Sequence, residues 1–96
     1  MAKLPMLDEH NKAYIRREKR LIDEARRLLN KGILDARLRK ALTAAGLPQT
    51  VVRDIEYPAD VKVAEELLNH EWERLHDHMR ANFDQKQVDK IFDELR

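Results

Sequence analysis

The chain has 96 residues, of which 43% are hydrophobic, 39% are charged and only 5% are aromatic. This length allows one domain with a narrow core, and the composition, with two glycines and three prolines, is typical of helices rather than sheets. The absence of cysteine excludes disulfides, zinc–thiolate sites and thiol catalysis.

The formal net charge of +1 hides a division along the chain. Residues 1–53 contain 13 Lys and Arg against 6 Asp and Glu, a net charge of +7. Residues 54–96 contain 6 basic and 12 acidic residues, a net charge of −6. This asymmetry predicts either a basic surface for an anionic partner or two halves that complement each other within one fold or across a dimer.

The first predicted helix covers residues 9–30, with Asp8 as its N-cap and Gly32 as its left-handed stop. Residues 1–7 before it are expected to form a flexible arm, because Pro5 disfavours an early helix and the segment offers little apolar surface. At about 100° per residue, the apolar side chains of the helix share one face. They are Tyr14, Ile15, Leu21, Ile22, Ala25, Leu28 and Leu29.

Glu18 interrupts this apolar face near its middle. A buried carboxylate is costly unless a cation or hydrogen-bond donor compensates it. A neighbouring helix, a second subunit or a ligand can supply that partner. Alternatively, the helix is rotated so that Glu18 lies at the rim of the core. Both arrangements fit the sequence.

The middle of the chain predicts two shorter helices around a tight corner. The second helix covers residues 34–45 and stops at Gly46, and Pro48 suits the first turn of a third helix. Pro58 ends this short helix near residues 56–57.

Two further helices follow. The fourth, from about Asp60 to about Asn82, carries an apolar stripe, and the last begins after Asp84, which forms a capping box with Gln87. The stripe of the fourth helix is Val61, Ala64, Leu68, Trp72, Leu75 and Met79. The sequence therefore predicts a single all-α domain over residues 1–96, a compact bundle of about five helices, two of them long.

The stretch from Arg37 to Pro58 resembles the helix-turn-helix of DNA-binding repressors. Small, turn and apolar residues stand at the positions that the motif requires, namely Ala45, Gly46, Leu47, Val52 and Ile55. The resemblance implies that Gln49, Thr50 and Arg53 face the bases, while the phosphates are contacted by Arg37, Arg39 and Lys40. The sequence departs from the motif at Leu42, where a small residue is usual. A purely structural corner is the alternative.

Residues suited to catalysis or metal binding do not form a convincing site. The outward stripe of the fourth helix contains Glu66, His70, Glu73 and Asp77, but the Glu-x-x-His spacing of di-iron bundles occurs only once, at Glu73 and His76. Serine and cysteine are both absent, and two isolated glycines cannot form a phosphate-binding loop. We therefore expect no catalytic residue, no metal and no cofactor.

The expected function is that of a small non-enzymatic regulatory or adaptor protein that binds a protein partner or itself. Its anchors are expected among exposed aromatic residues, because aromatics dominate interface energetics. The expected interaction residues are Tyr14, Glu18, Tyr57, Trp72 and Phe92. The alternative is a helix-turn-helix DNA-binding regulator. A cytoplasmic location is expected, and no small-molecule substrate is expected. We also expect no membrane contact, since no apolar run approaches the roughly 18 residues of a bilayer span.

Overall fold

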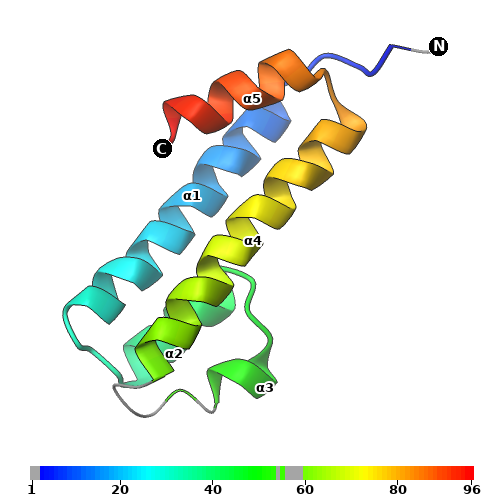
Figure 1. Cartoon of the computed structure of the whole chain (residues 1–96). Coiled ribbons are helices and arrows are strands. Elements are labelled where there is room, and N and C mark those ends of the chain that lie inside the picture. Colours follow the sequence, from blue (N-terminus) through cyan, green and yellow to red (C-terminus); the bar gives the residue numbers. More distant parts are fainter. Residues whose placement is uncertain (1–2, 54, 56–59) are drawn as a thin grey trace.

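The computed structural model describes residues 3–53, 55 and 60–96, and this part of the chain forms five α-helices and no strand (Figure 1). The helices are α1 (Glu9–Asn30), α2 (Ala36–Ala44), α3 (Gln49–Val52), α4 (Asp60–Asn82) and α5 (Gln85–Glu94). The predicted all-α bundle with two long helices is confirmed. None of the helices in the described ranges is both long and apolar enough to cross a membrane.

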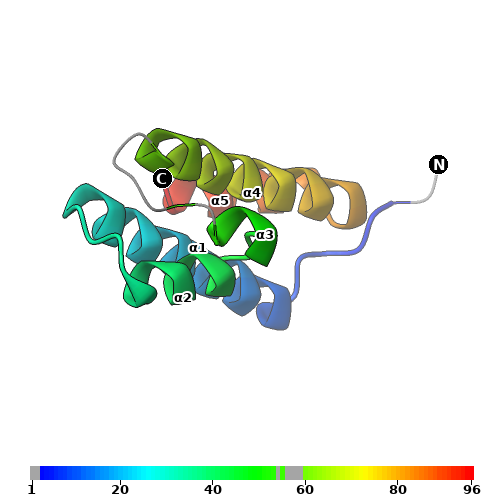
Figure 2. The same cartoon turned by 90° about the horizontal axis from the view of Figure 1, so that it is seen from below.

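The two long helices, α1 and α4, lie side by side in opposite directions and form the body of the molecule (Figure 1). The molecule is elongated, with extents of 49 × 21 × 18 Å. At one end, α5 packs against α4, and at the other end α2 packs against α1 and carries α3 beside it (Figures 1 and 2). Each short helix therefore covers only part of the long pair.

Two glycines end α1 and α2 in the same way. Gly32 has a φ of 72° and Gly46 a φ of 102°, a left-handed conformation that glycine adopts without a Cβ penalty. After each glycine, the next residue donates its N–H to a carbonyl of the last helical turn: Ile33 to Leu28 at 3.0 Å, and Leu47 to Leu42 at 3.1 Å. These bonds complete a Schellman motif at each helix end.

The boundaries of the two shorter central helices differ from the prediction. Asp35 accepts the N–H of Arg37 at 2.9 Å, and this side-chain cap starts α2 at Ala36 rather than at residue 34. Pro48 is the N-cap of α3 and not its first helical residue. The helix ends at Val52, and Ile55 is buried in the core beyond it, so α3 is shorter than predicted. Residues 56–59, where the predicted end falls, lie outside the described part of the chain.

Two hydrophobic clusters form the core. The first joins the C-terminal half of α1 to α2, α3 and the N-terminal half of α4, and it includes Ile22, Leu42 and Leu68. The second joins the N-terminal half of α1 to the C-terminal half of α4 and to α5, and it includes Ile15 and Phe92. Both clusters meet the indole of Trp72, which packs against each of them.

Aromatic and polar contacts around Trp72 hold α5 in place. The ring centroids of Trp72 and Phe92 are 4.5 Å apart, and the imidazole of His76 stacks on the Phe92 ring with the two centroids 4.3 Å apart. His76 Nε2 also lies 2.8 Å from Asp89 Oδ1 on α5. The hydrogen bond from the Arg26 guanidinium to the Asn69 amide oxygen links α1 to α4.

The N-terminal arm is attached to the fold, so the prediction of a flexible arm is wrong for its last residues. Leu7 is buried in the second cluster. Its N–H donates to Gln87 Oε1 at 2.8 Å, and the Asp84 N–H donates to the Pro5 carbonyl at 2.8 Å. Asp84 caps α5 as predicted, but Gln87 binds the arm instead of closing the capping box.

Substituting each stop glycine by alanine tests the corner. A Cβ at Gly32 meets no atom within 4 Å, so Gly32→Ala should cost only the left-handed penalty of about 1–2 kcal/mol. A Cβ at Gly46 lies 3.3 Å from Glu71 Oε2, so Gly46→Ala should cost more in urea unfolding. The excess should shrink when Glu71 is also alanine. Equal losses for the two glycine variants would contradict the close packing of the corner on α4.

Candidate functional site

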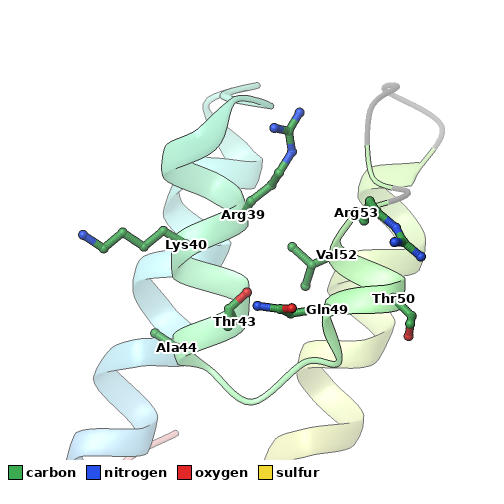
Figure 3. A pocket seen from close by; sticks show the side chains of 8 residues that line it. All are labelled: Arg39, Lys40, Thr43, Ala44, Gln49, Thr50, Val52 and Arg53. Carbon is green, nitrogen blue, oxygen red and sulfur yellow. The ribbon is translucent and has the colours of Figure 1, made fainter.

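A groove of about 750 Å³ lies between α2 and α3 (Figure 3). Its walls are Arg39, Lys40, Thr43, Ala44, Gln49, Thr50, Val52 and Arg53. We call this set the α2–α3 groove. Five of these residues belong to the set that the helix-turn-helix resemblance assigned to DNA contacts. The structure therefore brings most of that set together on one surface.

Helical spacing and the corner explain how the groove forms. Leu38 and Leu42 turn into the core at a spacing of four residues, which leaves the polar residues of α2 outside. The Schellman turn at Gly46 then places α3 beside α2 rather than in line with it. Small side chains such as Ala44 fill little of the space between the two helices, and Val52 points into it (Figure 3).

The cations of the groove are among the Lys and Arg side chains that have no carboxylate partner in the described part of the chain. Among the described residues, no ion pair includes Arg39, Lys40 or Arg53. Along α1, by contrast, Lys19 pairs with Asp23 at 2.7 Å and Arg27 pairs with Glu24 at 2.6 Å. Lysine and arginine donors without an internal partner are available to an external carboxylate or phosphate.

A second basic hollow of about 480 Å³ lies on the other side of α2, against α1. It shares Lys40 and Ala44 with the α2–α3 groove, and its apolar lining includes Leu28 and Ile33. Figure 3 shows the Lys40 side chain pointing away from α3, toward this second hollow. Residues 26–53, which supply most of both hollows, contain seven Lys and Arg and one acidic residue.

The residues proposed for base recognition do not all point outward. Gln49 extends across the gap toward Thr43, whereas Thr50 and Arg53 point away from α2 (Figure 3). A recognition helix presents several residues to the major groove, but α3 has only four residues. Arg37 forms a side-chain ion pair with Asp35 at 2.8 Å, and this contact lowers the pKa of Asp35. Arg37 is therefore less free to contact phosphate than predicted.

The predicted aromatic anchors lie in three different environments. Tyr14 is 37% exposed, with the Arg17 guanidinium carbon 5.5 Å from its ring centroid. Trp72 is half-buried and joins the two core clusters. Phe92 is only 1% exposed, so the expectation of an exposed anchor there is wrong, because the apolar face of α5 is needed to close the second cluster. Tyr57 lies outside the described residues.

Glu18 lies at the rim rather than in the core. The structure describes no buried charged side chain and no ion pair of Glu18. Partial burial raises its pKa; Arg17 lowers the pKa, Glu71 raises it and Arg74 lowers it. Its neighbours on the same face, Ile15 and Ile22, belong to different clusters, so Glu18 marks the division between the two cores.

The sequence analysis missed Val63, which is 50% exposed on α4. Together with Thr50, Val51, Ile55 and Asp60 it lines a smaller hollow of about 350 Å³ between α3 and α4. The available signal was its position: Val63 precedes Glu66, His70, Glu73 and Asp77 at alternating spacings of three and four residues, on the polar side of the helix. An apolar residue at the start of an acidic stripe has no role in the core.

Comparison of the chain with protein-family models, with curated proteins and with solved structures finds no match. In the described ranges, no group of three or more His, Asp or Glu side chains is placed to hold a metal ion. The α2–α3 groove combines apolar lining residues with cations that have no ion-pair partner among the residues the structure describes, and such a surface can bind an acidic, partly apolar ligand.

Glu18→Gln tests the rim position. The folded-state pKa of Glu18 is raised above its ordinary value of 4.5, so the folded protein holds this proton more tightly than the unfolded chain. Ionisation therefore destabilises the fold as the pH rises through this range. Glu18→Gln should raise the thermal midpoint slightly at pH 7. The gain in the free energy of unfolding should be less than about 1 kcal/mol, because solvent screens the site. This gain should vanish in acid.

The matched control is Glu94→Gln, at an exposed carboxylate at the end of α5. It should leave the midpoint unchanged at both pH values. A clear loss of stability at neutral pH in the Glu18 variant would show that the carboxylate has a cationic partner that the amide cannot replace.

Proposed function

We propose that this protein is a non-enzymatic adaptor or regulator that binds an acidic segment of a protein partner in the α2–α3 groove. The observation that carries the proposal is the combination of Arg39, Lys40 and Arg53, which form no ion pair within the described ranges, with the apolar lining residues Ala44 and Val52. Amphipathic peptide segments bind grooves of this kind through apolar anchors and flanking charges.

The lining of the groove supports a protein partner over a nucleic-acid backbone. Phosphates require positive and polar contacts, whereas the apolar residues in the two hollows beside α2 add nothing to phosphate binding. Single-stranded nucleic acid is usually held by stacking on aromatic rings, and no aromatic residue of the described part of the chain lines either hollow. A carboxylate-bearing segment with apolar side chains uses both parts of the surface.

Charge reversal in the groove tests this proposal. Arg39→Glu with Arg53→Glu should abolish binding of the partner, since like charges then face each other across the contact. The matched control is Arg20→Glu, an exposed cation of α1 that forms no ion pair among the described residues and lines none of the described hollows. The measurement is capture from lysate, with lysine-specific cross-linking and mass spectrometry of the bound proteins.

Lys40 provides a reporter for this experiment because it lies between the two hollows. Intermolecular cross-links from Lys40 should form with the native chain and with the Arg20 variant, and should disappear in the doubly reversed variant. Mixing isotope-labelled and unlabelled chains distinguishes another copy from another protein. Capture and Lys40 cross-links that persist in the reversed variant would overturn the proposal.

DNA binding is a second candidate function, favoured by the seven basic residues against one acidic residue in residues 26–53. If duplex DNA binds here, neutralising Arg39 or Lys40 should weaken all duplexes similarly and lower the salt dependence by about one unit for each contact. Changing Arg53 should instead relax preference at one base pair, by about 1–3 kcal/mol for a bidentate contact. The measurement is fluorescence anisotropy at about 50 mM salt, where phosphate contacts are strongest. Absence of binding at tens of micromolar protein would eliminate this candidate.

A further inference from the structure

We infer that the acidic segment that fills the α2–α3 groove is the outer stripe of α4 from a second copy of this chain. This inference rests on the proposed function of the groove and names its occupant. The stripe begins at Val63 and continues through exposed residues on one side of the helix. They are Glu66, His70, Glu73 and Asp77.

The stripe has the two properties that the groove requires. Its three carboxylates, on Glu66, Glu73 and Asp77, form no ion pair among the described residues, as the groove cations also do not. Val63, half-exposed at the start of the stripe, offers an apolar anchor. At 1.5 Å per residue the carboxylates, from Glu66 to Asp77, span about 16 Å, and α2 is about 13 Å long, so the carboxylates can reach along the whole of this groove wall.

The position of the stripe favours a symmetric pair. The α2–α3 groove and the α3–α4 hollow are neighbours, because Thr50 lines both, and Val63 lines the second. Figure 2 shows α3 between α2 and α4. Arg39 and Lys40 line the hollow on the α2 side of this short helix, and Val63, where the acidic stripe begins, lines the hollow on its α4 side. A two-fold axis near α3 therefore places the acidic stripe of each copy on the basic groove of the other, and this self-complementary arrangement closes as a dimer.

The molecule has enough surface for such a contact. The described chain exposes 6696 Å², and a standard interface covers about 800 Å² of each partner, roughly one eighth of that area. Charged contacts dominate this interface, and exposed charge pairs are screened within about 10 Å at 0.1 M salt. The association is therefore expected to depend strongly on ionic strength.

A charge-swap experiment tests the inference by sedimentation or light scattering of the full chain. The native protein should show twice the chain mass at high micromolar concentration and about 50 mM salt, and association should weaken about tenfold at about 0.5 M salt. Arg39→Glu with Arg53→Glu should weaken it about a hundredfold, because acidic surfaces then meet. Glu66→Lys with Glu73→Lys should weaken association by a similar factor, because basic surfaces then meet. Arg20→Glu and Glu94→Lys are the controls, and both should keep the native mass.

Mixing the two reversed variants is the decisive measurement. In the mixed pair both contacts again join opposite charges, so a complex of one chain of each kind should form although neither variant associates alone. Circular dichroism of each variant checks that the helices remain folded. A native chain of single mass at low salt, a mass that survives both reversals, or a mixture that stays monomeric would each overturn the inference. If the groove variant loses partner capture and the Glu66 and Glu73 variant keeps it, the proposed function stands. The occupant of the groove is then another protein rather than a second copy.

Discussion

The fold depends on one constraint: the apolar faces of the two long helices, α1 and α4, are too long to be covered by a single short helix. α1 has 22 residues and α4 has 23, whereas α2 and α5 have 9 and 10. The result is two separate clusters, one at each end of the long pair. Trp72 is the side chain that contacts both, and its indole also lies 5.9 Å from the Lys19 ammonium. Loss of this ring would separate the two halves of the core.

The same division explains the position of Glu18. A carboxylate in the middle of an apolar face is costly in a continuous core. Here it lies between Ile15 and Ile22, at the level where the first cluster ends and the second begins. Glu71 on α4 also raises the pKa of Glu18, and its carboxylate lies close to Gly46 at the end of α2. The end of α2 therefore lies at the same level of the bundle as the boundary between the two clusters.

The sequence predicted the helices whose ends carry strong local signals. Asp8 with Gly32 defined both ends of α1, and the apolar stripe defined α4. It missed features that depend on contacts between distant residues. Gln87 fits a capping box by spacing, yet its amide oxygen accepts a hydrogen bond from Leu7, 80 residues earlier. Phe92 and Trp72 both look like aromatic anchors in sequence, and only the packing of α5 shows that the first is fully enclosed. Five of the six residues assigned to DNA contacts line the α2–α3 groove. The groove itself, the direction of Gln49 and the exposure of Val63 depend on the arrangement of α2, α3 and α4, which the sequence did not predict.

The hydrogen bond between Leu7 and Gln87 also constrains the order in which the chain can fold as it is made. The first cluster uses residues from Ile22 to Leu68, with Trp72 at its edge, so all of its side chains exist before α5 is synthesised. The second cluster needs Leu7 and Ile15 from one end of the described chain and Val88, Ile91 and Phe92 from the other. Until these last residues leave the ribosome, the beginning of α1 has no partner on α5, and its apolar side chains remain in water. The end of the molecule that carries the basic groove can therefore form without α5, whereas the opposite end needs α5 to bury the start of α1.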